Sequence, residues 1–136
     1  MEFRDTTQED LDYMADNSMS RGVQKSCPDQ ISFMYTLADN GIPLGIGGFQ
    51  LINQHTAWCW VDISPVGHDN VRQSYRTIKE GIENFAKEYN LRRLQAYVEC
   101  DFDKAIRMVE HLGFERESTM TNFVGDKDAY MYKRIF

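Results

Sequence analysis

The hydrophobic period of this chain changes at Pro65, and that change most limits what the chain can fold into. Before Pro65, three runs predict β-strands, at about 31–38, 44–52 and 56–63. The first alternates with a period of two, the second has glycines in its middle, and the third carries two tryptophans. After Pro65, apolar side chains recur at alternating steps of four and three through residues 71–89, which predicts one long helix. Three successive strands followed by a long helix indicate a sheet with helices packed on it.

Shorter patterns extend this core in both directions. A strand around Phe3 is followed by a helix that Thr7 caps. Residues 94–99 alternate again directly after the long helix, which predicts a further strand. Asp101 is expected to cap a second amphipathic helix, and Gly113 is expected to end it in a left-handed conformation.

The chain closes with two more predicted strands, at about 114–119 and 129–135, joined across Gly125 and Asp126. The predicted fold class is therefore α/β, in the order β-α-β-β-β-α-β-α-β-β, with a mixed central sheet flanked by helices. At 136 residues the chain is expected to form a single domain, residues 1–136.

Glycines and one asparagine predict a turn and an irregular strand within this part of the sheet. Asn40-Gly41 between the first two of the three strands predicts a tight hairpin turn. Gly45, Gly47 and Gly48 thin the middle of the next strand, and glycines inside a strand indicate a bulge or a close approach of another group.

Composition and charge exclude several classes of protein. The chain has 15 basic and 21 acidic residues, and this acidic balance argues against nucleic-acid binding, which depends on Lys and Arg at phosphates. No apolar run approaches the about 18 residues of a membrane span, and the charged first residues do not resemble a secretory signal. A cytoplasmic protein is therefore expected. Three cysteines favour reduced thiols over disulfides, and three dispersed histidines match no metal-ligand spacing.

Several strings, taken with the predicted order, resemble one known superfamily. They are Arg4 with Asp10-Leu11, the segment 41–49, and Ala105-Ile106 with Leu112-Gly113-Phe114. Over nearly its whole length the chain resembles the GNAT superfamily of acyl-CoA-dependent N-acetyltransferases. The runs 97–102 and 113–117 further resemble small phage-encoded GNAT-like proteins, some of which resemble internal virion proteins.

The resemblance implies a site for acetyl-CoA between two strands that part, here 57–63 and 94–99. The pantetheine chain would lie along the exposed strand edge, and the pyrophosphate would lie on backbone N–H groups at the start of the helix 71–89. The residues expected to hold the cofactor are Val61, Ile63, Gly67, Asn70, Val71, Arg72, Gln73, Ser74 and Tyr75.

The chain departs from the family pattern at two places. The family loop R/Q-x-x-G-x-G/A would fall on residues 70–75, where Gln73 and Tyr75 occupy the two glycine positions. The family tyrosine that protonates the departing thiolate corresponds to Val109, and a nearby family asparagine corresponds to Phe102. Both substitutions give an apolar helix face, which is typical of a structural role.

A general base near the parting strands is expected to be a carboxylate. Asp62 lies late in the strand before the cofactor loop and Glu99 ends the partner strand, so these two are the predicted catalytic residues. For each, a solvated or ion-paired strand end is the alternative interpretation. Trp58 and Trp60 share one strand face, which fits an acceptor pocket, the core or an interface. With Tyr130 and Tyr132 they are also candidates for contacts in a homo-oligomer or with a partner.

Two functions follow from these observations. In the first, the protein transfers an acetyl group from acetyl-CoA to a small-molecule or protein amine, with Asp62 or Glu99 taking the amine proton. In the second, it is a catalytically silent GNAT-like protein with a degenerate acetyl-CoA site, a structural or interaction protein of a phage particle or its host takeover. Whether residues 16–30 close over a ligand stays open.

Overall fold

A seven-stranded sheet in the order β1-β2-β3-β4-β5-β7-β6 forms the centre of the protein. The computed structural model describes residues 1–19 and 32–136, so most of the segment 16–30, whose closure over a ligand was left open above, lies outside the described residues. The elements along the chain are β1 (Glu2–Asp5), α1 (Gln8–Asn17), β2 (Ser32–Asp39), β3 (Ile42–Asn53), β4 (Thr56–Ile63), α2 (Pro65–Asp69), α3 (Val71–Glu88), β5 (Arg93–Glu99), α4 (Asp103–His111), β6 (Glu115–Val124) and β7 (Lys127–Ile135). This confirms the predicted mixed α/β sheet, with α2 as an addition.

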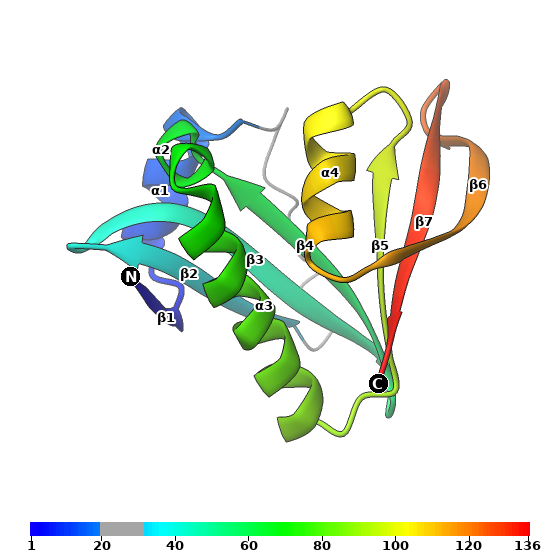
Figure 1. Ribbon diagram of the computed structural model, residues 1–136, viewed down its shortest axis with the longest axis horizontal. Coiled ribbons are helices and arrows are strands. Elements are labelled where there is room, and N and C mark those ends of the chain that lie inside the picture. The colour runs from blue at the N-terminus through cyan, green and yellow to red at the C-terminus, as the bar shows by residue number, and fades with distance from the viewer. Residues whose placement is uncertain (20–31) are drawn as a thin grey trace.

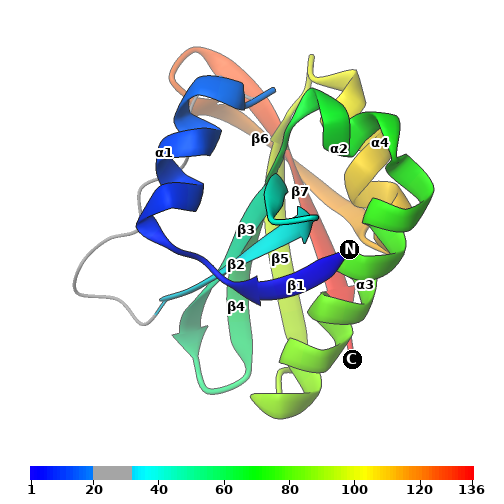
Figure 2. The same ribbon diagram turned by 90° about the vertical axis from the view of Figure 1, so that its left-hand side faces the viewer.

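The helices cover the sheet unequally. Helices α2, α3 and α4 lie on one face and α1 lies on the other (Figures 1 and 2). Every neighbouring pair of strands is antiparallel except β4 and β5, which are parallel. The single parallel pair requires the long crossover through α2 and α3, whereas short turns join the antiparallel pairs β2–β3, β3–β4 and β6–β7.

The tight connections follow the sequence closely. Asn40 and Gly41 adopt φ values of 50° and 78° between β2 and β3, as a two-residue hairpin turn requires. Gly125, at φ 65°, lies in the turn that joins β6 to β7. Asn90 and Gly113 take left-handed conformations after α3 and α4, which confirms the predicted end of α4.

The main core lies between the sheet and the pair α3–α4. Ile78, Ile82 and Phe85 point inward from α3 and are at most 5% exposed. Phe85 stacks on Phe49 of β3 with ring centroids 3.8 Å apart and planes within 6°. Burial of each such side chain contributes about 1.5 to 3 kcal/mol, so this face fixes the position of α3 against the sheet.

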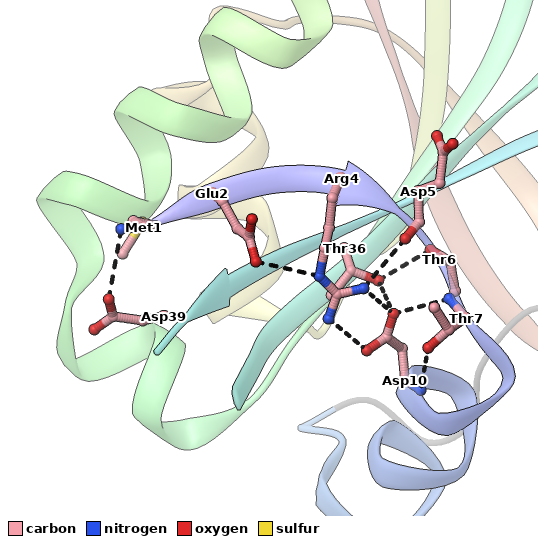
Figure 3. A network of polar contacts seen from close by, with 9 residues as sticks. All are labelled: Met1, Glu2, Arg4, Asp5, Thr6, Thr7, Asp10, Thr36 and Asp39. Atoms are coloured by element: carbon pink, nitrogen blue, oxygen red, sulfur yellow. Dashed lines mark hydrogen bonds and ion pairs between the residues drawn. The ribbon is translucent and has the colours of Figure 1, made fainter. Parts of the chain in front are cut away.

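A buried ion pair fixes α1 on the opposite face. Thr7 forms a capping box with Asp10, as its position before the helix predicts. Asp10 is 2% exposed and accepts hydrogen bonds from Arg4 of β1 and from Thr36 of β2 (Figure 3). The start of α1 is therefore bonded to two strands of the sheet.

Three expectations need correction. Ser64 caps α2 by accepting a hydrogen bond from the Gly67 N–H at 3.2 Å, and the Ser-Pro start of this helix was the missed signal. Helix α4 has Phe102, not Asp101, at its N-cap. Tyr132 is fully buried, so the expectation that it contacts a partner is wrong, because core packing already covers its ring.

Candidate active site

Strands β4 and β5 pair only at their beginnings. Three residue pairs join them, and the last is Trp58 with Gln95. Beyond this point β4 stays paired with β3 as far as Ile63, and β5 stays paired with β7 as far as Glu99. The two strands part from there in Figure 1, with α4 lying in front of the gap. The facing edges of 59–63 and 96–99 therefore lack ladder partners, which confirms the parting strands predicted from the sequence.

A cavity of about 410 Å³ occupies the space where the strands part. Its walls come from both strands and from the inner faces of α3 and α4, and most lining side chains are apolar. Val109 and Phe102 of the α4 region are among them, so the predicted apolar helix face forms one wall. The cavity falls within the usual size range of small-molecule sites, about 300 to 1,000 Å³.

Asp62 brings an incompletely bonded carboxylate to this cavity. It is 4% exposed and lines the cavity from β4. Its Oδ2 accepts a hydrogen bond from the Ser18 hydroxyl at 2.6 Å, whereas its Oδ1 has no partner among the described residues. Because a buried oxygen without a donor is costly, Oδ1 is suited to receive a hydrogen bond from a ligand.

Glu99 lies opposite Asp62 on the other strand. The pair Trp58 and Gln95 sets the register, and four further residues along each strand lead to Asp62 and Glu99, which both line the cavity. The carboxylate of Glu99 lies 3.5 Å from the Lys127 ammonium. The structure therefore brings the two predicted catalytic carboxylates to one cavity, and Glu99 has a cationic neighbour there.

Two further polar groups line the cavity. Tyr97 is the only hydroxyl-bearing residue among its described lining, and burial, followed by the charge of Glu99, raises the pKa of its phenol. Burial also raises the pKa of the Cys59 thiol, to about 12, so this thiol stays protonated and is a poor nucleophile. Sequence reasoning missed Tyr97, although its position two residues before Glu99 places both on one strand face.

The loop after β4 is organised differently from a glycine-rich phosphate loop. Gly67 is buried in α2, and a Cβ atom there would lie 2.4 Å from the Leu44 carbonyl oxygen. Ser74 is fully buried, and its hydroxyl donates to the Gly67 carbonyl at 3.0 Å. These two residues therefore join α2 to α3 and to β3.

The other residues predicted to hold the cofactor divide into two groups. Asn70, Val71, Arg72 and Gln73 lie at the start of α3, with Arg72 and Gln73 exposed. Val61, Ile63 and Tyr75 line a smaller cavity of about 50 Å³, which Asp62, His68 and Lys104 also line. Val61 lines the large cavity as well.

Tyr75 reaches from α3 toward α4. Its ring stacks on His111 of α4, with centroids 5.6 Å apart and planes 29° apart. Burial raises the pKa of Tyr75, and the charge of Arg107 opposes that effect. The ring thus occupies space between α3 and α4 beside the smaller cavity, at a position where the family pattern has glycine.

Comparisons with known proteins agree with this architecture. No protein-family model matches the chain, and no curated protein matches it. A mutant form of the spermidine N-acetyltransferase SpeG from Vibrio cholerae matches 99% of this chain and 95% of its own, with 15% identity and a TM-score of 0.81. A chimera of that enzyme with hSSAT gives 14% identity, 99% and 96% coverage and a TM-score of 0.78.

A third solved structure, a GNAT-family acetyltransferase from Bacillus anthracis, is 19% identical over 76% of this chain and 65% of that one, with a TM-score of 0.65. Because the sequence identities are this low, the structural similarity establishes the fold alone. The chain has the GNAT fold, as the strings in its sequence predicted. No helix of the described parts is long and apolar enough to cross a membrane.

Proposed function

We propose that this protein is an acyl-CoA-dependent N-acetyltransferase that acts on a primary amine. One observation carries the proposal: β4 and β5 part over a cavity of about 410 Å³ that is lined by the buried, incompletely bonded carboxylate of Asp62. A donor group of a ligand gives Asp62 Oδ1 the hydrogen bond that it lacks, and an extended ligand forms hydrogen bonds with the backbone groups of the open strand edges. The GNAT fold shared with SpeG and with the Bacillus anthracis acetyltransferase supports this interpretation.

The residues present fit acetyl-CoA in two respects. The edges of 59–62 and 96–98, which have no ladder partner across the gap, offer backbone donors and acceptors to the amides of a pantetheine chain. The first-turn N–H groups of α3, at Val71, Arg72 and Gln73, have no acceptor within their own helix and favour an anion such as a pyrophosphate. When bound, acetyl-CoA supplies an acetyl group activated as a thioester.

The side chains around the cavity have separate roles in this proposal. The Oδ1 atom of Asp62 accepts the proton of the incoming ammonium, because it is the described buried oxygen without a hydrogen-bond partner. Glu99 is the second candidate base, and its carboxylate forms an ion pair with the Lys127 ammonium at 3.5 Å. Tyr97 holds a proton at its phenolic oxygen and is the candidate donor to the leaving thiolate, in place of the family tyrosine at the Val109 position.

The acceptor is expected to approach from the sheet face that carries α1. Trp58 and Trp60 share that face of β4 with Asp62, and Tyr97 packs against Trp58 with ring centroids 6.1 Å apart. Aromatic rings of this kind attract alkylammonium groups. Spermidine is the first acceptor to test, because SpeG, which shares the fold, is a spermidine N-acetyltransferase.

Calorimetric titration with acetyl-CoA tests the first step. We expect binding in the micromolar range, about −8 kcal/mol, followed by amine-dependent thiol release with spermidine or another primary amine from a panel. Asp62→Asn is expected to lower kcat by about a hundredfold or more, whereas Asp69→Asn, in α2 outside both cavities, leaves it unchanged. If the titration shows no binding heat at acetyl-CoA concentrations up to the millimolar range, the proposal is overturned.

A second candidate function is that of a catalytically silent binding protein. The specific observation in its favour is the Tyr75 ring, which stacks on His111 at a family glycine position, together with Val109 at the family tyrosine position. In this case wild-type protein binds no acetyl-CoA, and the double variant Gln73→Gly with Tyr75→Gly acquires binding. A phage or host partner for such a protein stays a prediction from the sequence.

A further inference from the structure

Two contacts join the end of α1 to the end of β4. The Ser18 hydroxyl donates to Asp62 Oδ2 at 2.6 Å, and the Met19 N–H donates to the Ile63 carbonyl at 3.3 Å. Ser18 and Asp62 are 44 residues apart in the chain. The hydroxyl contact has the length of a charge-assisted hydrogen bond to a carboxylate, so it holds the Asp62 side chain strongly.

This bond leaves the two oxygens of Asp62 in different states. Oδ2 is bonded to Ser18, and Oδ1 has no partner among the described residues. Since Asp62 lines both the large and the small cavity and is 4% exposed, free rotation of its carboxylate would change which oxygen a ligand meets. A donor fixed on one oxygen removes that freedom.

The position of Ser18 is itself fixed from the far end of α1. Arg4 donates to both carboxylate oxygens of Asp10, at 2.6 and 2.8 Å, and Thr36 donates to Asp10 at 2.9 Å. These bonds tie the first turn of α1 to β1 and β2 (Figure 3). Ser18 caps the other end of the same ten-residue helix, so the helix carries its hydroxyl to a defined place above β4.

We propose that Ser18 is a positioning residue for catalysis: its hydroxyl holds the Asp62 carboxylate so that Oδ1 receives the proton of the acceptor amine. This inference rests on the proposed acetyltransferase function and adds to it a residue that acts through Asp62. Ser18 lines neither cavity that Asp62 lines, so its effect is on the orientation of the base rather than on the volume of the site.

Steady-state kinetics of Ser18→Ala and Ser18→Thr test the proposal. Ser18→Ala is expected to lower kcat by about ten- to a hundredfold and to leave the KM for acetyl-CoA unchanged. Ser18→Thr keeps the hydroxyl and is expected to restore most of the rate. The matched control is Ser118→Ala, which removes an exposed hydroxyl on β6 and is expected to change neither constant.

A second measurement identifies the residue through which Ser18 acts. If Ser18 works through Asp62, the double variant Ser18→Ala with Asp62→Asn has the same kcat as Asp62→Asn alone. Independent, multiplying losses would overturn the proposal. Circular dichroism of each variant confirms that the proteins compared are folded.

The outcomes separate this inference from the proposed function. A wild-type protein that neither binds acetyl-CoA nor acetylates any amine overturns both. An active wild type with an unchanged kcat in Ser18→Ala overturns the role of Ser18 alone. A raised KM for acetyl-CoA with an unchanged kcat also overturns it, because that result assigns Ser18 to the shape of the cofactor site.

Discussion

Arg4 of β1 and Asp10 of α1 form a bidentate ion pair, in which Nη1 donates to Oδ2 at 2.6 Å and Nη2 donates to Oδ1 at 2.8 Å. Thr7 N–H and the Thr36 hydroxyl also donate to the Asp10 carboxylate. The carboxylate therefore connects a strand, a helix cap and a second strand. Because Ser18 at the other end of α1 contacts Asp62, this ion pair also helps to place the candidate base.

We first predict that Asp10→Asn lowers the free energy of unfolding by about 3 kcal/mol. That is the low end for a broken buried pair, since the Arg4 side chain keeps 29% of its area exposed. Urea unfolding of the variant measures the loss. Asp16→Asn removes an exposed carboxylate from the same helix and is expected to change stability by less than about 0.5 kcal/mol. Equal effects of the two variants would contradict this role for Asp10.

The stability of the wild type is expected to fall in acid for the same reason. The Arg4 hydrogen bonds hold the pKa of the Asp10 carboxyl well below its ordinary value of 3.8, although burial opposes them. A carboxyl whose pKa is lower in the folded state contributes stability above its unfolded pKa and loses it as the pH falls. The difference in the free energy of unfolding between wild type and Asp10→Asn should therefore be largest at pH 7 and decrease below about pH 4. Urea unfolding at a series of pH values measures it.

Gly67→Ala is predicted to destabilise the protein by about 1 to 3 kcal/mol through overpacking. The added Cβ would lie 2.4 Å from the Leu44 carbonyl oxygen and 2.7 Å from a side-chain carbon of Ile63, and the carbonyl belongs to the backbone of β3. Thermal unfolding measures the effect. Val66→Ala, at an exposed position of the same helix, is the control. A Gly67→Ala variant of normal stability would show that α2 shifts without cost.

Tyr75→Ala is predicted to strengthen acetyl-CoA binding by about tenfold, or about 1.4 kcal/mol. The substitution removes a ring that fills space between α3 and α4 next to the smaller cavity. Calorimetry of wild type and variant gives the comparison, with Glu80→Gln at an exposed position of α3 as the control. Weaker binding in Tyr75→Ala would mean that the ring contacts the cofactor instead of excluding it.

Tyr97→Phe is predicted to lower kcat by about ten- to a hundredfold while the KM for acetyl-CoA stays constant. The variant keeps the aromatic ring, which packs against Trp58 and Phe123, and loses only the phenolic hydroxyl group. Steady-state rates measured with one amine provide the readout. Tyr130→Phe, whose ring packs under Arg116 away from the cavity, is the matched control. An unchanged kcat would exclude Tyr97 as the proton donor.

Local patterns determined much of this protein from the sequence alone. The change of period at Pro65, the Asn40-Gly41 turn and the glycine after α4 depend on neighbouring residues only, and each has the predicted structure. Asp62 and Glu99 were predicted as candidate bases because each lies at or near the end of a predicted strand, a position set by chain order, and both line the cavity. The strings shared with the GNAT superfamily added the parting of β4 and β5.

Tertiary structure decided which side chains meet. No local pattern indicates that Ser18 bonds to Asp62 across 44 residues, that Tyr97 lines the cavity, or that Tyr132 is fully buried. Gly67 is the residue type that a phosphate-binding loop requires, but in the structure it is packed inside α2 against Leu44 and Ile63. The physical reason is that hydrophobic period and turn chemistry are properties of a few adjacent residues, whereas burial and hydrogen-bond partners depend on how distant segments are brought together by the whole core.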